Sequence, residues 1–202
     1  MRSRRRATSL RLLAGASLFA FAAPALAGAQ QYEVLSASVR ATLATAVNDR
    51  STVDMKDLDT RAWVRAMTHR VSSRFPEEDS ARQFLALVRY EAMRAGLDPH
   101  LVLAVIDVES HFRKYAVSKS GARGYMQVMP FWVEQLGGKS DNLFAERTNL
   151  RYGCVILRHY LDREKGNLSN ALARYNGSLG QRDYPNRVLR AWKDRWALSV
   201  PA

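Results

Sequence analysis

One glutamate, Glu109, stands where an apolar residue is expected, and it is the first candidate for chemistry in this sequence. At about 100° of rotation per helical residue, it falls about 40° from Val105 and close to Phe112, inside the apolar arc of the helix expected there. Ionising a buried carboxyl group is costly, so burial should raise its pKa and keep it protonated near neutral pH. Glu109 is therefore predicted to be a general acid.

An ion pair is the alternative role for Glu109, because carboxylates on buried faces also lock helices together when an Arg reaches them. Arg123 and Arg174 are the candidate partners. Asp107 lies about 200° from Val105 on the same helix, on the face predicted to meet solvent. It should therefore point away from Glu109 and not form the carboxylate pair that most glycosidases use.

The run after this helix has the composition of a wall of a cleft. Gly121 and Gly124 permit tight turns or a close approach of the backbone. Gln127 follows, with one donor and one acceptor group, between Met126 and Met129. Such a run is usually only a loop, but its position just after Glu109 favours a place in the site.

Helices are the elements that must position these residues, since no apolar alternation of strand type extends beyond a few residues. Asp98 and Pro99 form a good N-cap and first position for the helix that carries Glu109. The predicted helices cover residues 33–50, 63–75, 77–95, 99–112, 148–165, 170–175 and a last stretch from 185 onward. The predicted fold class is all-α.

Three short motifs resemble those of the soluble lytic transglycosylases of the bacterial envelope, which have a lysozyme-like catalytic domain. Residues 109–112 match Glu-Ser-x-Phe, and residues 121–130 match Gly-Ala-x-Gly-Leu-Met-Gln-x-Met-Pro with Tyr125 in place of Leu. Residues 171–178 resemble Ala-x-x-Ala-Tyr-Asn-Ala-Gly, with Arg174, Gly177 and Ser178 in place of Ala, Ala and Gly. The resemblance covers about residues 97–192 and implies a lysozyme-like helical domain.

This resemblance implies cleavage of the β-1,4 bond between N-acetylmuramic acid and N-acetylglucosamine in peptidoglycan, without water. Protonated Glu109 would donate to the glycosidic oxygen, and the acetamido group of the substrate would stabilise the cationic sugar. The carboxylate would then take the proton of the 6-hydroxyl, which closes a 1,6-anhydro ring. A single carboxylate suffices for this scheme.

The resemblance also implies roles for other motif residues. The residues expected to bind substrate are Ser110, Gly124, Met126, Gln127, Tyr175, Asn176 and Tyr184. Tyr175 and Asn176 would lie across from Glu109, with the Tyr175 hydroxyl helping to place the carboxyl group. Plainer alternatives are a core aromatic for Tyr175, a space-filling role for Met126 and a helix-ending turn at Asn176.

The first 27 residues have the features of a secretory signal peptide. A stretch with five Arg precedes an apolar run and the small-x-small site at residues 25–27. An uncleaved membrane anchor is the alternative, but about 12 apolar residues are fewer than the roughly 20 that span a bilayer. Removal of these five charges leaves about +7 of the formal +12. A basic exported protein is expected in the periplasm with an anionic envelope polymer rather than nucleic acid as its partner.

The chain is accordingly predicted to comprise the signal peptide, residues 1–27, an N-terminal helical extension, residues 28–95, and a catalytic domain, residues 96–202. No stable membrane anchor is expected after signal cleavage. The extension is not explained by the resemblance and could contact an envelope protein.

No cofactor or metal is predicted, because His100 and His159 lack metal-ligand spacing. Cys154, the single cysteine, lies on an apolar stripe and is expected to be buried.

Three other functions remain open at this stage. A hydrolase resembling goose-type lysozyme would use water instead of the 6-hydroxyl. A peptidoglycan-binding protein of an envelope assembly would use the cleft with little turnover, although this chain keeps Glu109. A periplasmic adaptor would act through residues 28–95.

Overall fold

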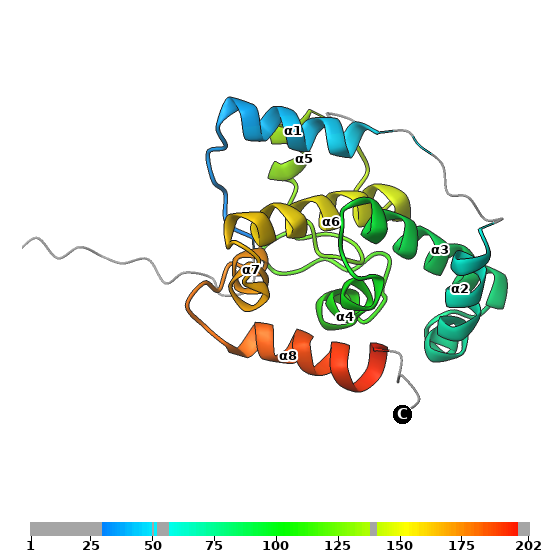
Figure 1. Cartoon of the computed structure of the whole chain (residues 1–202). Helices are drawn as coiled ribbons and strands as arrows, with labels where there is room; N and C mark the ends of the chain where they lie inside the picture. Colours follow the sequence, from blue (N-terminus) through cyan, green and yellow to red (C-terminus); the bar gives the residue numbers. More distant parts are fainter. Residues whose placement is uncertain (1–29, 50, 52–56, 138–140, 198–202) are drawn as a thin grey trace, which may run out of the picture.

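The computed structural model describes residues 30–49, 51, 57–137 and 141–197, and these residues form helices joined by loops (Figure 1). The predicted signal peptide lies outside the described residues. Within the described part, β-structure is limited to isolated bridges that join Arg123 to Val117 and Val128. The all-α fold class is thus confirmed.

The helices follow the apolar pattern closely. Their bounds are α1 Ala37–Asn48, α2 Leu58–Val71, α3 Glu78–Arg94, α4 Pro99–Ser110, α5 Phe131–Leu136, α6 Glu146–Arg163, α7 Leu168–Tyr175 and α8 Asp183–Ala191, with a 3-10 turn at Ser72–Arg74 and the π-helical turn η2 at Trp192–Trp196.

The starts of five helices, α1, α2, α6, α7 and α8, differ from the prediction by two residues or more. Thr148 or Asn149 was expected to begin α6, but the helix begins at Glu146. The N-cap of α7 is Asn167, whose side chain accepts from the Asn170 backbone N–H, rather than Ser169 or Asn170 itself. Helix α5 has one turn and a half and too few residues to show a periodicity, so the sequence did not predict it.

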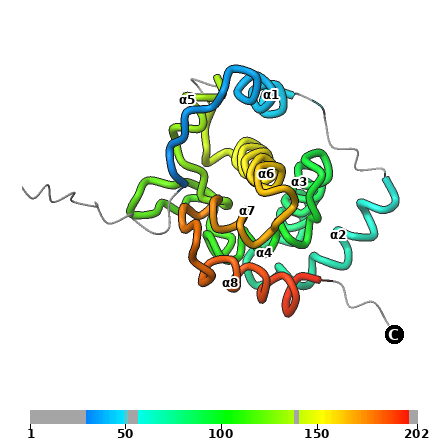
Figure 2. The backbone as a smooth tube through the Cα atoms, turned by 60° about the vertical axis from the view of Figure 1, so that its left-hand side comes forward, coloured from blue at the N-terminus to red at the C-terminus, as the bar shows by residue number. Residues whose placement is uncertain are grey.

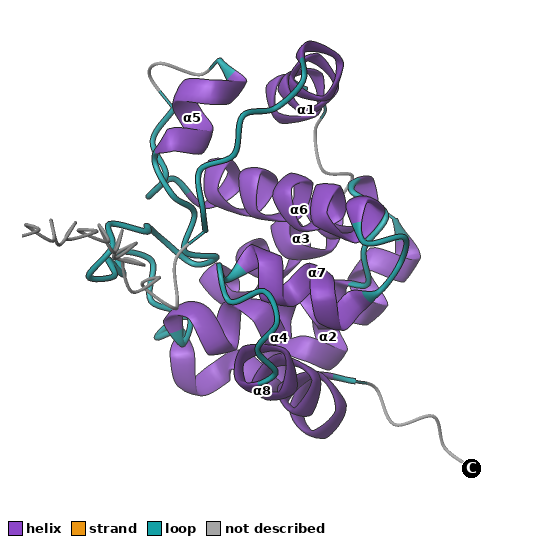
Figure 3. Cartoon of the chain, turned by 90° about the vertical axis from the view of Figure 1, so that its left-hand side faces the viewer, coloured by secondary structure: helices purple, strands orange, loops and turns teal. Residues whose placement is uncertain are grey.

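The long helix α6 lies at the centre of the molecule (Figure 2). It packs against α1, α3 and α7, while α4 packs against α3, α8 and η2. Figure 3 shows α1 and α5 on one side of α6, and α4 and α8 on the other. One hydrophobic core includes residues from the predicted extension, such as Leu43 and Phe84, together with residues of the predicted catalytic domain, such as Leu103 and Leu157. The domain boundary at residues 95–96 remains a prediction.

Several local features agree with their sequence signals. The Asp98 side chain accepts from the His100 backbone N–H at 2.8 Å and caps α4, and Gly96 ends α3 with a φ of 65°. Cys154 is fully buried, as predicted. None of the described helices is both long enough and apolar enough to cross a membrane.

Candidate active site

Glu109 occupies the last turn of α4, where the chain leaves the helix abruptly. His111 and Phe112 follow with φ values of 50° and 61°, which turn the backbone away from the helix axis. The Ser110 hydroxyl lies 2.7 Å from the Tyr125 carbonyl oxygen and 3.1 Å from that of Ile106. Ser110 therefore joins the end of α4, next to Glu109, to the loop that holds the second motif, residues 121–130, which we call the glycine-containing loop.

The Tyr184 hydroxyl is the hydrogen-bond partner of the Glu109 carboxyl group. It donates to Oε1 at 2.6 Å from the first turn of α8, and its own ring is buried. Burial raises the pKa of Glu109 from its usual 4.5 to about 7, against the opposing effects of the Tyr184 hydrogen bond and the Arg187 charge. A carboxyl group with this pKa can both donate and accept a proton near neutrality.

The ion pairs considered as the alternative role of Glu109 are not formed with Arg123 or Arg174. Arg174 instead pairs with Glu164 and Glu33, and the Arg123 guanidinium lies over the Phe144 ring. In the part of the chain that the structure describes, Glu109 makes no ion pair. The carboxyl group is thus free of the partner that would have made its role a structural one.

The prediction that Asp107 faces solvent is wrong. Its side chain is buried and accepts from Arg195 Nε at 2.9 Å and from Trp196 Nε1 at 3.1 Å. The helical wheel placed it opposite the apolar arc, but η2 covers that face of α4. Asp107 is therefore bound by a guanidinium group and an indole N–H, and not by solvent.

The glycine-containing loop is stabilised largely by its own hydrogen bonds. Gln127 Nε2 donates to the carbonyl oxygens of Ala116 at 3.1 Å and Gly124 at 2.9 Å. Gln127 itself adopts a φ of 48°, an uncommon conformation for a side chain of this size. The amide predicted to contact substrate therefore first organises the loop that carries it.

Asn149 of α6 is the residue on which the loop rests, and the sequence suggested for it only a capping role. Its Oδ1 accepts from the Met126 backbone N–H, and its Nδ2 donates to the carbonyl oxygens of Arg123 and Leu143, each at 2.8 Å. An Asn in the first turn of a helix satisfies ordinary capping statistics, so sequence alone could not signal these three bonds.

Gly124 is required for this close approach. It has a φ of 74°, and a Cβ atom there would lie 2.4 Å from Asn149 Nδ2 and 2.6 Å from the Leu143 carbonyl oxygen. Any side chain would break the contact with Asn149. The structure thus gives Gly124 a packing role, and its contact with substrate stays a prediction.

Met126 and Tyr175 are both buried, and they meet. The Tyr175 hydroxyl donates to the Met126 carbonyl oxygen at 2.7 Å, and the Met126 side chain packs against Gly153. The expectation that the Tyr175 hydroxyl places the Glu109 carboxyl group is corrected, because Tyr184 makes that bond. Likewise, Met126 fills the core in this structure and does not line an open cleft.

Asn176 follows Tyr175 as the C-terminal cap of α7 and is half-buried. The first and second motifs meet in space through Ser110 and Tyr125, and the second and third through Met126 and Tyr175. In the described ranges, no group of three or more His, Cys, Asp or Glu side chains could hold a metal ion.

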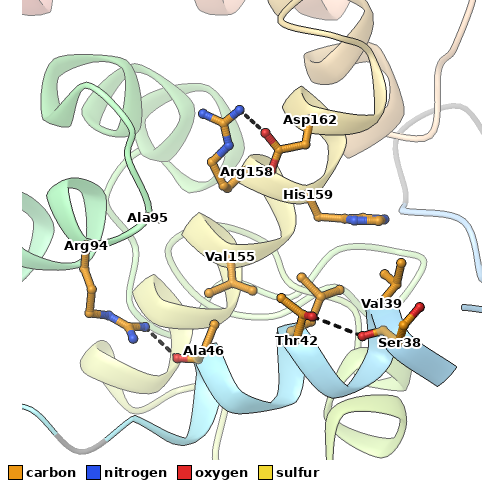
Figure 4. A pocket seen from close by; sticks show the side chains of 11 residues that line it. Ser38, Val39, Thr42, Ala46, Arg94, Ala95, Val155, Arg158, His159 and Asp162 are labelled. Carbon is orange, nitrogen blue, oxygen red and sulfur yellow. Dashed lines mark hydrogen bonds and ion pairs between the residues drawn. The ribbon is translucent and has the colours of Figure 1, made fainter. Parts of the chain in front are cut away.

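A separate cavity of about 380 Å³ lies between α1, α6 and the end of α3 (Figure 4). Val39, Leu43 and Val155 contribute its apolar lining, and Arg158 pairs with Asp162 at its rim. Glu109 and the motif residues do not line it. The cavity is therefore distinct from the site around Glu109.

Residues 86–194 match the family described as "Transglycosylase SLT domain". The chain is also 36% identical over 116 residues to "Membrane-bound lytic murein transglycosylase C" from Yersinia pestis (strain Pestoides F) and from Yersinia pseudotuberculosis serotype O:1b. Each alignment covers 50% of this chain and 32% of the relative, so the chain spans about a third of these relatives' length.

Among solved structures, the chain resembles an inactive mutant of the lytic transglycosylase Slt from Pseudomonas aeruginosa. The TM-score is 0.43 at 25% sequence identity, over 67% of this chain and 24% of the other.

Proposed function

Because the chain belongs to the transglycosylase SLT domain family, we propose that it is a lytic transglycosylase that cleaves peptidoglycan. The bond broken is the β-1,4 link between N-acetylmuramic acid and N-acetylglucosamine, and the product end is a 1,6-anhydro sugar. The observation that carries this proposal is the state of Glu109, a half-buried carboxyl group with a pKa of about 7 and a tyrosine as its hydrogen-bond partner.

Glu109 acts first as an acid. Its proton passes to the glycosidic oxygen as the bond from that oxygen to the anomeric carbon breaks, and the acetamido oxygen of the substrate bonds to the same carbon. Because the Tyr184 hydroxyl donates a hydrogen bond to Oε1, the proton is delivered from Oε2. When Glu109 becomes a carboxylate, this hydrogen bond and the nearby Arg187 charge stabilise the anion.

Glu109 then acts as a base. The carboxylate takes the proton of the 6-hydroxyl as that oxygen attacks the anomeric carbon, which releases the acetamido oxygen and restores the acid. No second carboxylate takes part, since Asp107 is held by Arg195 and Trp196. A pKa near 7 suits both halves of this cycle better than the pKa of an exposed Glu.

The motif residues are proposed to form the walls on which the sugars lie. Ser110 fixes the end of α4, and Gln127 and the Met126 backbone shape the loop beside Glu109. Asn176 extends the opposite wall, after Tyr175. Signal-directed export of residues 28–202 to the periplasm, where peptidoglycan lies, belongs to the same proposal.

The rivals predict different products. A lysozyme-like hydrolase would let water complete the reaction and leave a reducing end. A peptidoglycan-binding protein would retain the polymer without release, and an adaptor would act through residues 28–95 independently of Glu109.

Mass spectrometry of fragments released from purified peptidoglycan tests the proposal directly. The unmodified protein should release muropeptides one water lighter than reducing-end fragments, and Glu109→Gln should release none. Reducing-end products would indicate the hydrolase. Binding of peptidoglycan without release of fragments by either protein would indicate the peptidoglycan-binding protein.

A further inference from the structure

An extended segment ahead of α1 reaches the site from a part of the chain that carries none of the three motifs. This N-terminal strap, residues 30–35, runs from the neighbourhood of α7 to α1 and is drawn in blue (Figures 1 and 2). Gln30 is only 4% exposed, although it lies near the beginning of the described chain. Its Oε1 accepts from the Met129 backbone N–H at 3.1 Å, in the second motif.

The strap also touches the third motif. Gln31 Nε2 donates to the Gly177 carbonyl oxygen at 3.3 Å. Burial raises the pKa of the Tyr175 hydroxyl, and the nearby Gln30 side chain opposes that rise. Tyr175 in turn donates to the Met126 carbonyl oxygen, so two adjacent glutamines join both motifs at the point where these already meet.

The next two residues anchor the strap to three helices. The Tyr32 ring packs edge-on against Phe131 at the start of α5, with 5.5 Å between ring centroids. The Glu33 carboxylate pairs with Arg163 of α6 and, at 3.8 Å, with Arg174 of α7. These contacts give residues 30–33 a defined place without any regular secondary structure of their own.

The second motif depends on such outside support. Its backbone makes no helix or strand between residues 121 and 130, and Gln127 holds a strained conformation. The Gln30 side chain satisfies the backbone N–H of Met129 at the far end of this loop, as Asn149 satisfies that of Met126. Loss of either hydrogen bond would let the loop beside Glu109 adopt a wider range of conformations.

We propose that the N-terminal strap is a positioning element of the active site, and that Gln30 sets the second motif against the third. The proposal rests on the proposed function for its effect on turnover. It also implies that residues 30–35 act with the catalytic unit and not with the rest of the predicted extension.

The test is Gln30→Met in the chain of residues 28–202, because Met keeps the volume of the side chain and removes its acceptor. Val34→Ala is the matched control, as Val34 belongs to the same strap and is 87% exposed. Amide exchange of Met129, followed by NMR, should be at least about 10-fold faster in Gln30→Met and unchanged in Val34→Ala. On soluble glycan strands, kcat should fall about 5–20-fold with KM within about twofold.

The proposal is overturned if Met129 exchange and kcat both match those of Val34→Ala. A second outcome also overturns it. If Gln30→Met has a lower Tm, and if its kcat equals that of the unmodified protein once the assay temperature is lowered by the same amount, Gln30 has only a structural role. If the unmodified protein releases no fragments, the proposed function fails, and the exchange rate of Met129 alone decides whether the strap positions the loop.

Discussion

Glu91 and Glu109 lie on neighbouring helices, α3 and α4, and both turn a carboxyl group toward the protein interior. Glu91 is fully buried and is surrounded by three guanidinium groups. Arg151 binds both of its oxygens, at 2.9 and 3.2 Å, Arg94 lies at 3.1 Å and Arg147 at 3.4 Å. Glu109 has a tyrosine hydroxyl in place of these cations.

The partners, and not the burial, separate the two roles. Glu91 pairs with three Arg side chains, and two of them, Arg147 and Arg151, belong to α6, so the cluster joins α3 to α6. The ion-pair role that the sequence left open for Glu109 is therefore the role of Glu91. Burial raises the pKa of Glu109 to about 7, and no ion pair at Glu109 among the described residues offsets this rise, so its proton remains available near pH 7.

Glu109→Gln should produce the largest change. Loss of the acid should lower turnover of peptidoglycan by about 10²–10⁴-fold, because Gln cannot donate a proton to the glycosidic oxygen. The fold should be retained, since Gln keeps the acceptor for Tyr184. Fragment release checks the loss of turnover, and a circular dichroism spectrum checks that the fold is retained. A fully active variant would show that Glu109 is not the acid and that its role does not differ from that of Glu91 in this way.

Glu91→Gln should have the opposite effect. Removal of the anion leaves three guanidinium groups close together in the α3–α6 interface, and the free energy of unfolding should fall by about 3–5 kcal/mol. Turnover per folded molecule should change little. Urea unfolding monitored by Trp fluorescence provides the measurement, and a variant as stable as the parent would show that the cluster does not hold the helices together.

The pH dependence of stability should report the raised pKa of Glu109. A folded-state pKa of about 7 means that the folded chain binds more protons than the unfolded chain between pH 4.5 and 7. The contribution of Glu109 to stability is therefore present below pH 4.5 and is lost as pH rises through about 7. Relative to the parent, Glu109→Gln should gain about 1–3 kcal/mol across this window, after allowance for partial exposure.

Chemical unfolding of both proteins at pH 4.5, 6 and 8 measures this difference. A constant difference across the three values would mean that the pKa of Glu109 is not raised by folding.

Tyr184→Phe should have the smallest effect of the four. Loss of the hydrogen bond that lowers the pKa of Glu109 should move the alkaline limb of the activity profile to higher pH. Turnover should fall by about tenfold, because the carboxylate formed after proton donation loses one stabilising donor. A pH profile of fragment release tests this shift. Tyr175→Phe is the matched control, because Tyr175 bonds to Met126, and it should leave the limb in place.

Much of the fold could be predicted because apolar residues recur at helical spacing along the buried face of each long helix. The α1 stripe of Leu43 and Val47, the Asp98 cap and the Gly96 stop all appear in the structure. The short helix α5 and the true start of α7 could not be predicted, since one turn has no periodicity and several neighbouring side chains could cap.

The site divides in the same way. Glu109 was identifiable because a lone carboxyl group interrupts an apolar arc, and this inference needs only helix geometry. Asp107 was misplaced because the wheel describes one helix, whereas η2, about 85 residues later, covers its other face. The bond to Glu109 expected of Tyr175 is made by Tyr184 for a related reason, because either side chain could reach Glu109 until α7 and α8 were placed.

By itself the sequence determined the helical class, the candidate general acid and the segments that surround it, because these depend on side-chain type and local spacing. Tertiary structure alone decided which groups face these residues. Four sets of contacts join residues far apart in the chain: the Tyr184 bond to Glu109, the Arg ion pairs of Glu91, the hydrogen bonds of Asn149 and the Gln30 bond to Met129. Such contacts are set by how helices pack, and packing determines whether a buried carboxyl group becomes an ion pair or an acid.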